Sequence, residues 1–292
     1  GPFLSMNPFS SRCCQHNHAQ GWLYFTEHLV LATPDNGVAI AIYAACKATV
    51  KVGDGKEITL HEETNYPFEE AIAFTVSTGE KVAFPFYLRI PSWTQKAEVR
   101  VNGKKVSAAP VAGKYLCINR EWANGDRVEL TLPMSLSMRT WQVNKNSISV
   151  DYGPLTLSLK IAEKYVEKDS RETAIGDSKW QKGADSKKWP TTEIYPDSPW
   201  NYSLVLDKKE PLKNFKVIRK SWPTDNYPFT VASVPLEVKA IGRPVPEWKI
   251  DETGLCGVLP EEDAVKGDKE EITLIPMGAA RLRISAFPNT KE

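Results

Sequence analysis

Apolar residues recur at every second position along most of the chain. From Val38 to Leu132 they form a series of short alternating runs, separated by turn-forming stretches such as "GDG", "STGE" and "ANGD". A period of two predicts strands with one buried side and one solvent-facing side. Many short strands at regular spacing, without helices between them, are typical of an antiparallel β-sandwich. We therefore predict a first sandwich at residues 36–142.

The stretch "VRVNGKKV", Val99 to Val106, carries the strongest local turn signal in this sandwich. An Asn-Gly pair between two short alternating runs favours a two-residue hairpin turn, because both residues tolerate positive φ. The sequence therefore predicts a hairpin centred on Asn102 and Gly103.

A second series of strand patterns begins at "SISVDYGPLTLSLKI", Ser147 to Ile161, and resumes after residue 200. The stretch around residues 165–200 contains several tryptophans and lacks clean periodicity, so we predict an irregular insertion there. The closing run "EEITLIPMGAARLRISAFP" alternates in two halves, which predicts a hairpin. These patterns place a second antiparallel sandwich at residues 143–292.

One segment near the start has the period of a helix. In "AQGWLYFTEHLVLA", residues 19–32, apolar residues recur at steps of three and four: Trp22, Phe25, Leu29 and Ala32. That spacing predicts one apolar helical face. The following "TPDNG" predicts the end of the helix, because proline cannot continue the helical hydrogen bonds and Asn-Gly favours a turn. No second helix is indicated, so the predicted fold class is mainly β.

Composition is that of an ordinary globular protein. The chain has 292 residues, of which 41% are hydrophobic and 25% are charged. This length favours two domains over one. The formal net charge is +1, with 37 basic and 36 acidic residues, and this balance does not favour nucleic acid or an anionic membrane as a partner. No apolar run has the length needed to cross a bilayer.

The chain has five cysteines: Cys13, Cys14, Cys46, Cys117 and Cys256. An odd and sparse count argues against a disulfide framework. The last three lie in strand-like apolar runs. We predict that these three are small buried hydrophobic residues.

The densest candidate chemistry is "SSRCCQHNHAQGW", residues 10–22, where vicinal Cys13 and Cys14 precede His16 and His18. Thiolates are soft ligands that favour zinc, and a thiolate near the start of a helix is also a candidate nucleophile. Two cysteines supply only half of a tetrahedral shell, and the two histidines match no standard zinc-finger spacing. Buried or incidental thiols therefore stay open as the alternative.

Two other groups of residues have a functional and a structural interpretation. The stretch "HEETNYPFEEA" contains four glutamates: Glu62, Glu63, Glu69 and Glu70. We predict a solvated strand edge there, with an acid/base pair as the alternative. Most of the tryptophans are predicted to pack in the core. Trp180 and Trp189, in the irregular insertion, are the candidates for stacking on a sugar.

Several stretches resemble glycoside hydrolase family 127, the β-L-arabinofuranosidase-like enzymes. "MNPFSSRCCQHNHAQGWLYFTEHLVLATPDNGVAIAIYAA" resembles a junction found in that family, and its Cys-Cys pair is the most specific signal. "FYLRIPSW", "VRVNGKKV", "YLCINREWANGDRVELTLPM" and "VDYGPLTLSL" resemble the family's sandwich region. "SPWNYSLVLD", "PLEVKAIGRPVPEW" and "ITLIPMGAARLRISAFP" resemble the C-terminal domain of one of its branches.

The resemblance implies a fold and a place in it. Family members carry a helical (α/α) barrel first and β-sandwiches after it. Residues 1–35 would then be the end of such a barrel, with its last helix, and the rest of this catalytic domain would be missing from the chain. The two sandwiches would follow it.

The resemblance also implies roles for the cysteine pair. Cys13 corresponds to the nucleophile and a zinc ligand, and Cys14 to a second zinc ligand. The family's other zinc ligands, a glutamate and a cysteine, lie upstream, as does its acid/base glutamate, and no residue here matches them. The reaction implied is a double displacement with retention, in which the thiolate attacks the anomeric carbon, a carboxylic acid protonates the leaving oxygen, and water releases the sugar.

The sequence departs from the family pattern directly after the pair. Two prolines and an asparagine follow the cysteines in the characterised pattern, whereas Gln15 and His16 stand in place of the prolines here and Asn17 keeps its position. We expect His16, Asn17 and His18 to contact the metal ligands or to cap backbone groups. The sugar specificity stays open.

The function expected is therefore that of the C-terminal part of a zinc-dependent retaining glycoside hydrolase that acts on plant-type glycans. Zinc, the glycan and the missing catalytic domain are the partners expected for the intact enzyme, and this chain alone is expected to be inactive. The resemblance implies a bacterial protein of the periplasm or the extracellular space. The alternatives are a non-catalytic carbohydrate-binding or scaffold module and a surface interaction domain with buried thiols.

Overall fold

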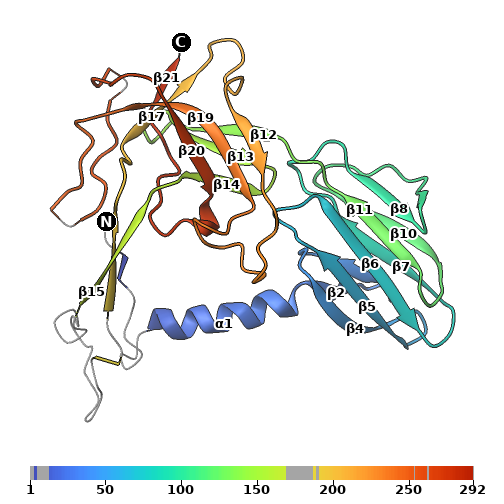
Figure 1. Ribbon diagram of the computed structural model, residues 1–292. Helices are drawn as coiled ribbons and strands as arrows, with labels where there is room; N and C mark the ends of the chain where they lie inside the picture. The colour runs from blue at the N-terminus through green and yellow to red at the C-terminus, as the bar shows by residue number, and fades with distance from the viewer. Residues whose placement is uncertain are drawn as a thin grey trace. The chain divides into compact units, whose positions relative to one another are not determined.

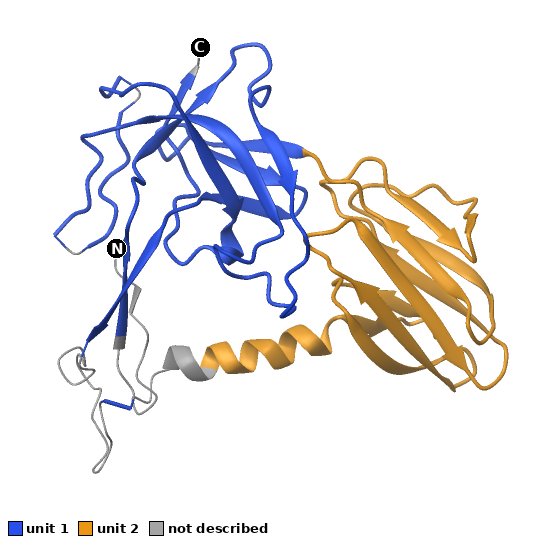
Figure 2. Cartoon of the chain, viewed as in Figure 1, with its two compact units in different colours: residues 1–15, 136–292 blue, residues 16–135 orange. Residues whose placement is uncertain are grey.

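The computed structural model describes residues 3–4, 13–168, 187–188, 191–252, 254–261 and 263–291. The chain divides into two compact units, coloured separately in Figure 2. Unit 2 is residues 16–135, and unit 1 combines residues 1–15 with 136–292. Both are built mainly from strands, so the predicted fold class is confirmed.

Unit 2 contains two sheets. The smaller sheet has the order β10–β7–β3–β2 and the larger has the order β4–β5–β6–β11–β8–β9. All strand pairs are antiparallel except β3 with β7. The strands are β2 (Val30–Ala32), β3 (Val38–Ile40), β4 (Cys46–Val52), β5 (Lys56–Thr64), β6 (Ala71–Thr78), β7 (Val82–Arg89), β8 (Glu98–Val101), β9 (Lys104–Lys105), β10 (Tyr115–Trp122) and β11 (Arg127–Thr131).

The core of unit 2 lies between these two sheets, as in a β-sandwich. Phe74 from the larger sheet meets Phe86 from the smaller sheet edge to face, with ring centroids 5.6 Å apart. Trp122 is fully buried, and its Nε1 donates to the Phe84 carbonyl over 3.0 Å. The alternating apolar residues of the sequence supply this core, because every second side chain of a strand points to the same side.

The predicted hairpin turn is confirmed. β8 pairs with β9 around Asn102 and Gly103, whose φ values are 51° and 76°. A Cβ atom strains such a conformation, and Asn and Gly tolerate it best.

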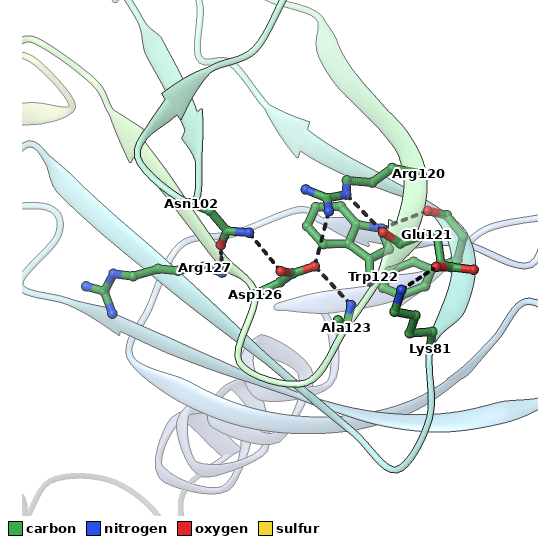
Figure 3. A network of polar contacts seen from close by, with 9 residues as sticks. Lys81, Asn102, Arg120, Glu121, Trp122, Ala123, Asp126 and Arg127 are labelled. Atoms are coloured by element: carbon green, nitrogen blue, oxygen red, sulfur yellow. Dashed lines mark hydrogen bonds and ion pairs between the residues drawn. The ribbon is translucent and has the colours of Figure 1, made fainter.

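A polar network joins this turn to the next one along the sheet (Figure 3). Asp126 accepts hydrogen bonds from Asn102 Nδ2 over 2.8 Å and from the Ala123 backbone over 2.9 Å. The Arg120 guanidinium lies 3.5 Å from the same carboxylate. Asn102 Oδ1 in turn accepts from the Arg127 backbone over 2.8 Å. The Asp126 carboxylate thus links the Asn-Gly turn to the turn that contains Ala123.

Unit 1 contains one large and one small sheet (Figure 1). The large sheet follows the path β12–β13–β14–β20–β19–β17–β21, with β18 also paired to β19, and the small sheet has the order β1–β16–β15. The strands are β1 (Phe3–Leu4), β12 (Leu136–Trp141), β13 (Ser147–Tyr152), β14 (Leu155–Leu159), β15 (Glu163–Lys168), β16 (Thr191–Pro196), β17 (Tyr202–Leu206), β18 (Lys216–Arg219), β19 (Leu236–Pro244), β20 (Glu270–Pro276) and β21 (Asn289–Lys291). All residues of β13 and β17 are buried, so both faces of these strands are covered.

The helix lies earlier in the chain than predicted. It spans Cys13–Glu27 (α1), whereas the periodicity predicted residues 19–32. Leu29 is 6% exposed and accepts a hydrogen bond from the Ala41 backbone, and Val30 pairs with Ile40. The last residues of the predicted helix therefore join the sandwich instead. Strand pairing provides hydrogen bonds for their backbone N–H and C=O groups, and it also buries Leu29.

Two smaller predictions also need correction. β12 pairs with β13, so residues 136–141, which we assigned to the first sandwich, belong to unit 1. The predicted closing hairpin is not formed: β20 pairs with β14 and β19, and the later half of the run bonds to other strands, as at Phe287 with Ile148. No helix in the described part of the chain is long and apolar enough to span a membrane.

Candidate functional site

The cysteine pair lies at the start of α1. Cys13 and Cys14 are its first two residues, and their side chains lie outside the described part of the structure, as does that of His16. Asn17 and His18 are exposed, and the His18 ring meets the Trp22 ring edge-on at 6.0 Å. The backbone position agrees with a thiol at a helix N-terminus. The predicted roles of these residues stay predictions.

A zinc site requires several His, Cys, Asp or Glu side chains close together. Among the described residues, no group of three or more His, Cys, Asp or Glu side chains could hold a metal ion. Cys13 and Cys14 would supply two donors, whereas a structural zinc site needs four and a catalytic site needs three protein ligands. The residues described therefore do not make a complete zinc site by themselves.

The predicted sugar-stacking residues Trp180 and Trp189 lie outside the described residues. The glutamate prediction is confirmed in part. Glu63 is exposed and lies 3.3 Å from Arg127, and Glu69 is exposed as well. Glu70 is half-buried and accepts a hydrogen bond from the Met134 backbone over 2.9 Å.

Glu62 contradicts the prediction of a solvated edge. It is 2% exposed, and its cross-strand partner is Cys46, whose Sγ lies 3.8 Å from Glu62 Oε2. Glu62 Oε1 has no hydrogen-bond partner among the described residues. The alternation of β5 explains its place, because Glu62 continues the inward series of Ile58 and Leu60.

Burial keeps this pair uncharged. It raises the pKa of Glu62 to about 8, which hydrogen bonds from the Ala44 backbone and from Cys46 offset only in part. Burial, together with the nearby Glu62, raises the pKa of Cys46 to about 11. A protonated thiol is a poor nucleophile, so this environment disfavours nucleophilic attack by Cys46 at neutral pH.

The other two single cysteines also differ from their prediction. Cys117 and Cys256 are exposed, and Cys46 is half-buried. All three are free thiols. Cys117 occupies a position of β10 that faces away from the core, so an apolar run in the sequence concealed an outward-facing side chain.

The outer faces of the two sheets in unit 2 differ in chemistry. Across the smaller sheet, one outward row joins directly paired residues: Leu31, Ala39, Tyr87 and Cys117. The corresponding row across the larger sheet is Lys47, His61, Thr75 and Arg127. The second row is the usual solvated face of an antiparallel sheet, whereas the first is apolar. This difference depends on the register of the strands, because each row combines residues from separate strands.

A shallow depression lies on the apolar face, with Asp35 at its edge and Tyr87 and Tyr115 in its lining. The Tyr87 hydroxyl donates to Asp35 Oδ2 over 2.6 Å. A hydrogen bond from the Thr33 hydroxyl, with that from Tyr87, holds the pKa of Asp35 below its usual value. Tyr115 is 48% exposed, so an aromatic surface beside a carboxylate is open to a partner. Sequence reasoning missed this face.

Comparison with known proteins identifies the architecture of unit 2. Residues 37–134 match the family profile described as "Beta-L-arabinofuranosidase, GH127 middle domain". No curated protein is significantly similar to the chain in sequence.

Solved structures share the fold over nearly the whole chain. A GH127 β-L-arabinofuranosidase from Geobacillus stearothermophilus T6 is 21% identical with a TM-score of 0.62, over 96% of this chain and 37% of its own. A structure described as a glycoside hydrolase is 20% identical with a TM-score of 0.65, over 99% of this chain and 45% of its own. The GH127 β-arabinofuranosidase BT3674 is 22% identical with a TM-score of 0.62, over 99% and 42%. The chain therefore spans less than half the length of these structures, and the predicted family resemblance is confirmed.

Proposed function

We propose that this chain, whose residues 37–134 form a GH127 middle domain, is the β-sandwich portion of a retaining glycoside hydrolase that cleaves arabinofuranosyl bonds in plant-type glycans. The family match carries this proposal. The similarity of fold over 96–99% of the chain supports it. The catalytic domain would be supplied by the larger part of the enzyme, which this chain does not span.

Two surfaces support contact with such a domain. Apolar side chains on α1 are open to solvent, since Trp22 is 61%, Leu23 is 64% and Tyr24 is 62% exposed. The smaller sheet also carries an outward apolar row, which passes through the depression lined by Tyr87 and Tyr115. Large exposed apolar surfaces mark sites of contact with another protein surface. We assign α1 to the catalytic domain, and we assign the apolar row of the smaller sheet to a surface that contacts this domain.

Cys13 is the proposed nucleophile. A thiolate at the first turn of a helix is stabilised by the backbone N–H groups and the helix dipole. Its sulfur would form a bond to the anomeric carbon as the bond to the leaving oxygen breaks, and a carboxylic acid outside this chain would donate the proton to that oxygen. Water would then give a proton to that carboxylate, form a bond to the anomeric carbon and release the sulfur as the thiolate, which restores both groups. Zinc, when bound, would keep the thiol in its thiolate form.

The test uses the intact enzyme and an aryl arabinofuranoside. We expect Cys13→Ser to lower kcat by about a thousandfold or more, because a hydroxyl at neutral pH is a far weaker nucleophile than a thiolate. Cys256→Ser is the matched control, since Cys256 is an exposed free thiol in unit 1 and does not lie on the sheet face assigned to contact with the catalytic domain. Unchanged turnover in Cys13→Ser would overturn the assignment. The 292-residue chain alone is expected to show no hydrolysis.

A further inference from the structure

Unit 1 contains a cavity of about 260 Å³. Three of its lining residues can make directed contacts: Trp200, Arg281 and Arg283. The rest of its lining is mostly apolar and includes Ile250 and Leu255. Small-ligand sites combine an apolar wall with a few placed polar groups, and a cavity of this size suits a single sugar ring.

Trp200 is held in place by its surroundings. Its ring packs against Trp248 at 5.1 Å between centroids, in a T-shaped arrangement. Trp248 is 3% exposed, and its Nε1 donates to the Gly257 carbonyl over 3.0 Å. The neighbouring Asn201 donates to the Val245 carbonyl over 2.9 Å. The Trp200 ring is therefore oriented before any ligand arrives, which lowers the entropy cost of binding.

A small hairpin forms the apolar wall. Ile250 pairs with Cys256, and the Asp251 backbone donates to the Leu255 carbonyl over 2.8 Å. Leu255 is 59% and Ile250 is 43% exposed, so this wall presents apolar side chains to the open cavity. The apolar face of a sugar ring matches such a surface beside an aromatic ring.

The two arginines bring positive charge to the same cavity. They alternate with Leu282 and Ile284, which are each 7% exposed, so both arginines leave the backbone on the solvent side. Arg283 Nε donates to the Ala280 carbonyl over 2.7 Å. Among the described residues, neither guanidinium forms an ion pair with a carboxylate.

One carboxylate, Glu163, lies close to this group and is already engaged. Glu163 Oε2 accepts from the Tyr165 hydroxyl over 2.6 Å, and Glu163 Oε1 accepts from the Arg281 backbone over 3.1 Å. These bonds use the carboxylate without pairing it to either guanidinium. The Arg281 side chain also hydrogen-bonds to the Tyr165 hydroxyl, so it shares this polar cluster without an ion pair. Each arginine has one such neutral contact, and its other guanidinium N–H groups are left for an anionic ligand.

We infer that this cavity binds a sugar residue that carries a carboxylate, with its ring against Trp200 and its carboxylate on Arg281 and Arg283. Guanidinium groups bind planar carboxylates through paired hydrogen bonds, which a neutral sugar cannot match. The choice of a sugar acid over other carboxylates rests on the proposed function. The site would hold the enzyme on acidic glycans while catalysis takes place elsewhere.

The test titrates the 292-residue chain with an oligogalacturonide and with a neutral galactan oligosaccharide of equal length, followed by calorimetry. We expect saturable binding of the acidic oligosaccharide only. The Arg281→Gln/Arg283→Gln double variant should weaken it by about tenfold or more. The matched control is Lys208→Gln/Lys209→Gln, which removes the same charge at exposed positions that do not line the cavity. Thermal melting checks that both variants fold.

Three outcomes would overturn the inference. Equal binding of the neutral oligosaccharide would show that the site does not recognise a carboxylate. Tighter binding of an acidic peptide would indicate a protein partner instead. An equal loss of affinity in both double variants would show that the net charge of the chain, and not the two cavity arginines, drives binding. Hydrolysis of the aryl arabinofuranoside by the intact enzyme is measured separately, so the proposed function can fail or stand independently of this site.

Discussion

The buried carboxyl of Glu62 shows how one residue can depart from its apparent place in a sequence. Four glutamates within ten residues suggest a solvated edge, and three of them lie at or near the surface. Glu62 occupies an inward position of β5, beside Cys46, and its Oε1 accepts no hydrogen bond from the part of the chain that the structure describes. An unpaired buried polar atom costs folding free energy, so this position constrains unit 2.

We expect the stability of the chain to fall as pH rises through this titration. The pKa of Glu62 is raised to about 8, above its ordinary value of 4.5. Its favourable contribution is thus complete below pH 4.5 and is lost progressively as pH rises to about 8. Linkage sets the loss on the order of 3–5 kcal/mol.

Urea unfolding at pH 5 and pH 8.5 measures this change. Glu62→Gln should remove most of it, because the amide does not titrate. Glu63→Gln, an exposed neighbour on the same strand, is the control. A pH dependence that persists unchanged in Glu62→Gln would contradict the assignment.

Asp126 has the opposite behaviour. Burial raises its pKa, but hydrogen bonds from Ala123 and Asn102, together with the charges of Arg120 and Lys81, outweigh burial and lower it. Its stabilisation is therefore present above pH 3.8 and is lost as pH falls through the lowered pKa. Asp126→Asn should cost about 1–3 kcal/mol at pH 7 and much less near pH 2.

Denaturant unfolding at both pH values tests this expectation. Asp54→Asn is the control, since Asp54 is exposed in the turn between Gly53 and Gly55. An equal cost of Asp126→Asn at pH 7 and pH 2 would show that charge is not what stabilises the two turns.

At the scale of the elements, α1 is a helix whose described side chains contribute nothing to the buried core of either unit. All of its described side chains are exposed, although they include Trp22, Leu23 and Tyr24. The sequence indicates the helix through its period. Leu29, the buried residue of the predicted apolar face, nevertheless lies after the helix, in the connection to β2. Pairing of β2 with β3, across the turn at residues 33–37, decides this boundary, and a period of 3.6 residues carries no information on strand pairing.

Replacing Trp22, Leu23 and Tyr24 together by Gln should change the free energy of unfolding of this chain by less than about 0.5 kcal/mol, because exposed side chains lose little on substitution. Leu29→Ala, at a residue that is 6% exposed, should cost about 2–4 kcal/mol. Urea titration compares the two. A large cost of the triple substitution would mean that α1 already packs within this chain.

At the scale of the whole molecule, the described residues form two separate cores. One comprises residues between Val38 and Leu132, and the other comprises residues between Ile148 and Phe287, with no residue in common. The alternation in the sequence predicts both cores. The unit boundary at residue 135 depends on which neighbour β12 pairs with, so sequence reasoning placed it a few residues too late.

Separate cores should unfold in separate steps. Phe74→Ala removes a fully buried ring from unit 2 and should cost that unit about 3–5 kcal/mol. Calorimetry should show one transition at a lower temperature and the other unchanged. Hydrogen exchange identifies which unit has moved. An equal shift of both transitions would show that the two units fold as one.

The sequence by itself determined the mainly β fold, the Asn-Gly hairpin and the family resemblance, because period, turn chemistry and local motifs are properties of neighbouring residues. Only the tertiary structure decided the limits of α1, the burial of Glu62, the apolar row from Leu31 to Cys117 and the cavity beside Trp200. Each of these depends on strand register or on loops far apart in the chain. Register brings together residues that no local pattern relates, and a shift of one residue would exchange the buried and the exposed side chains of a strand.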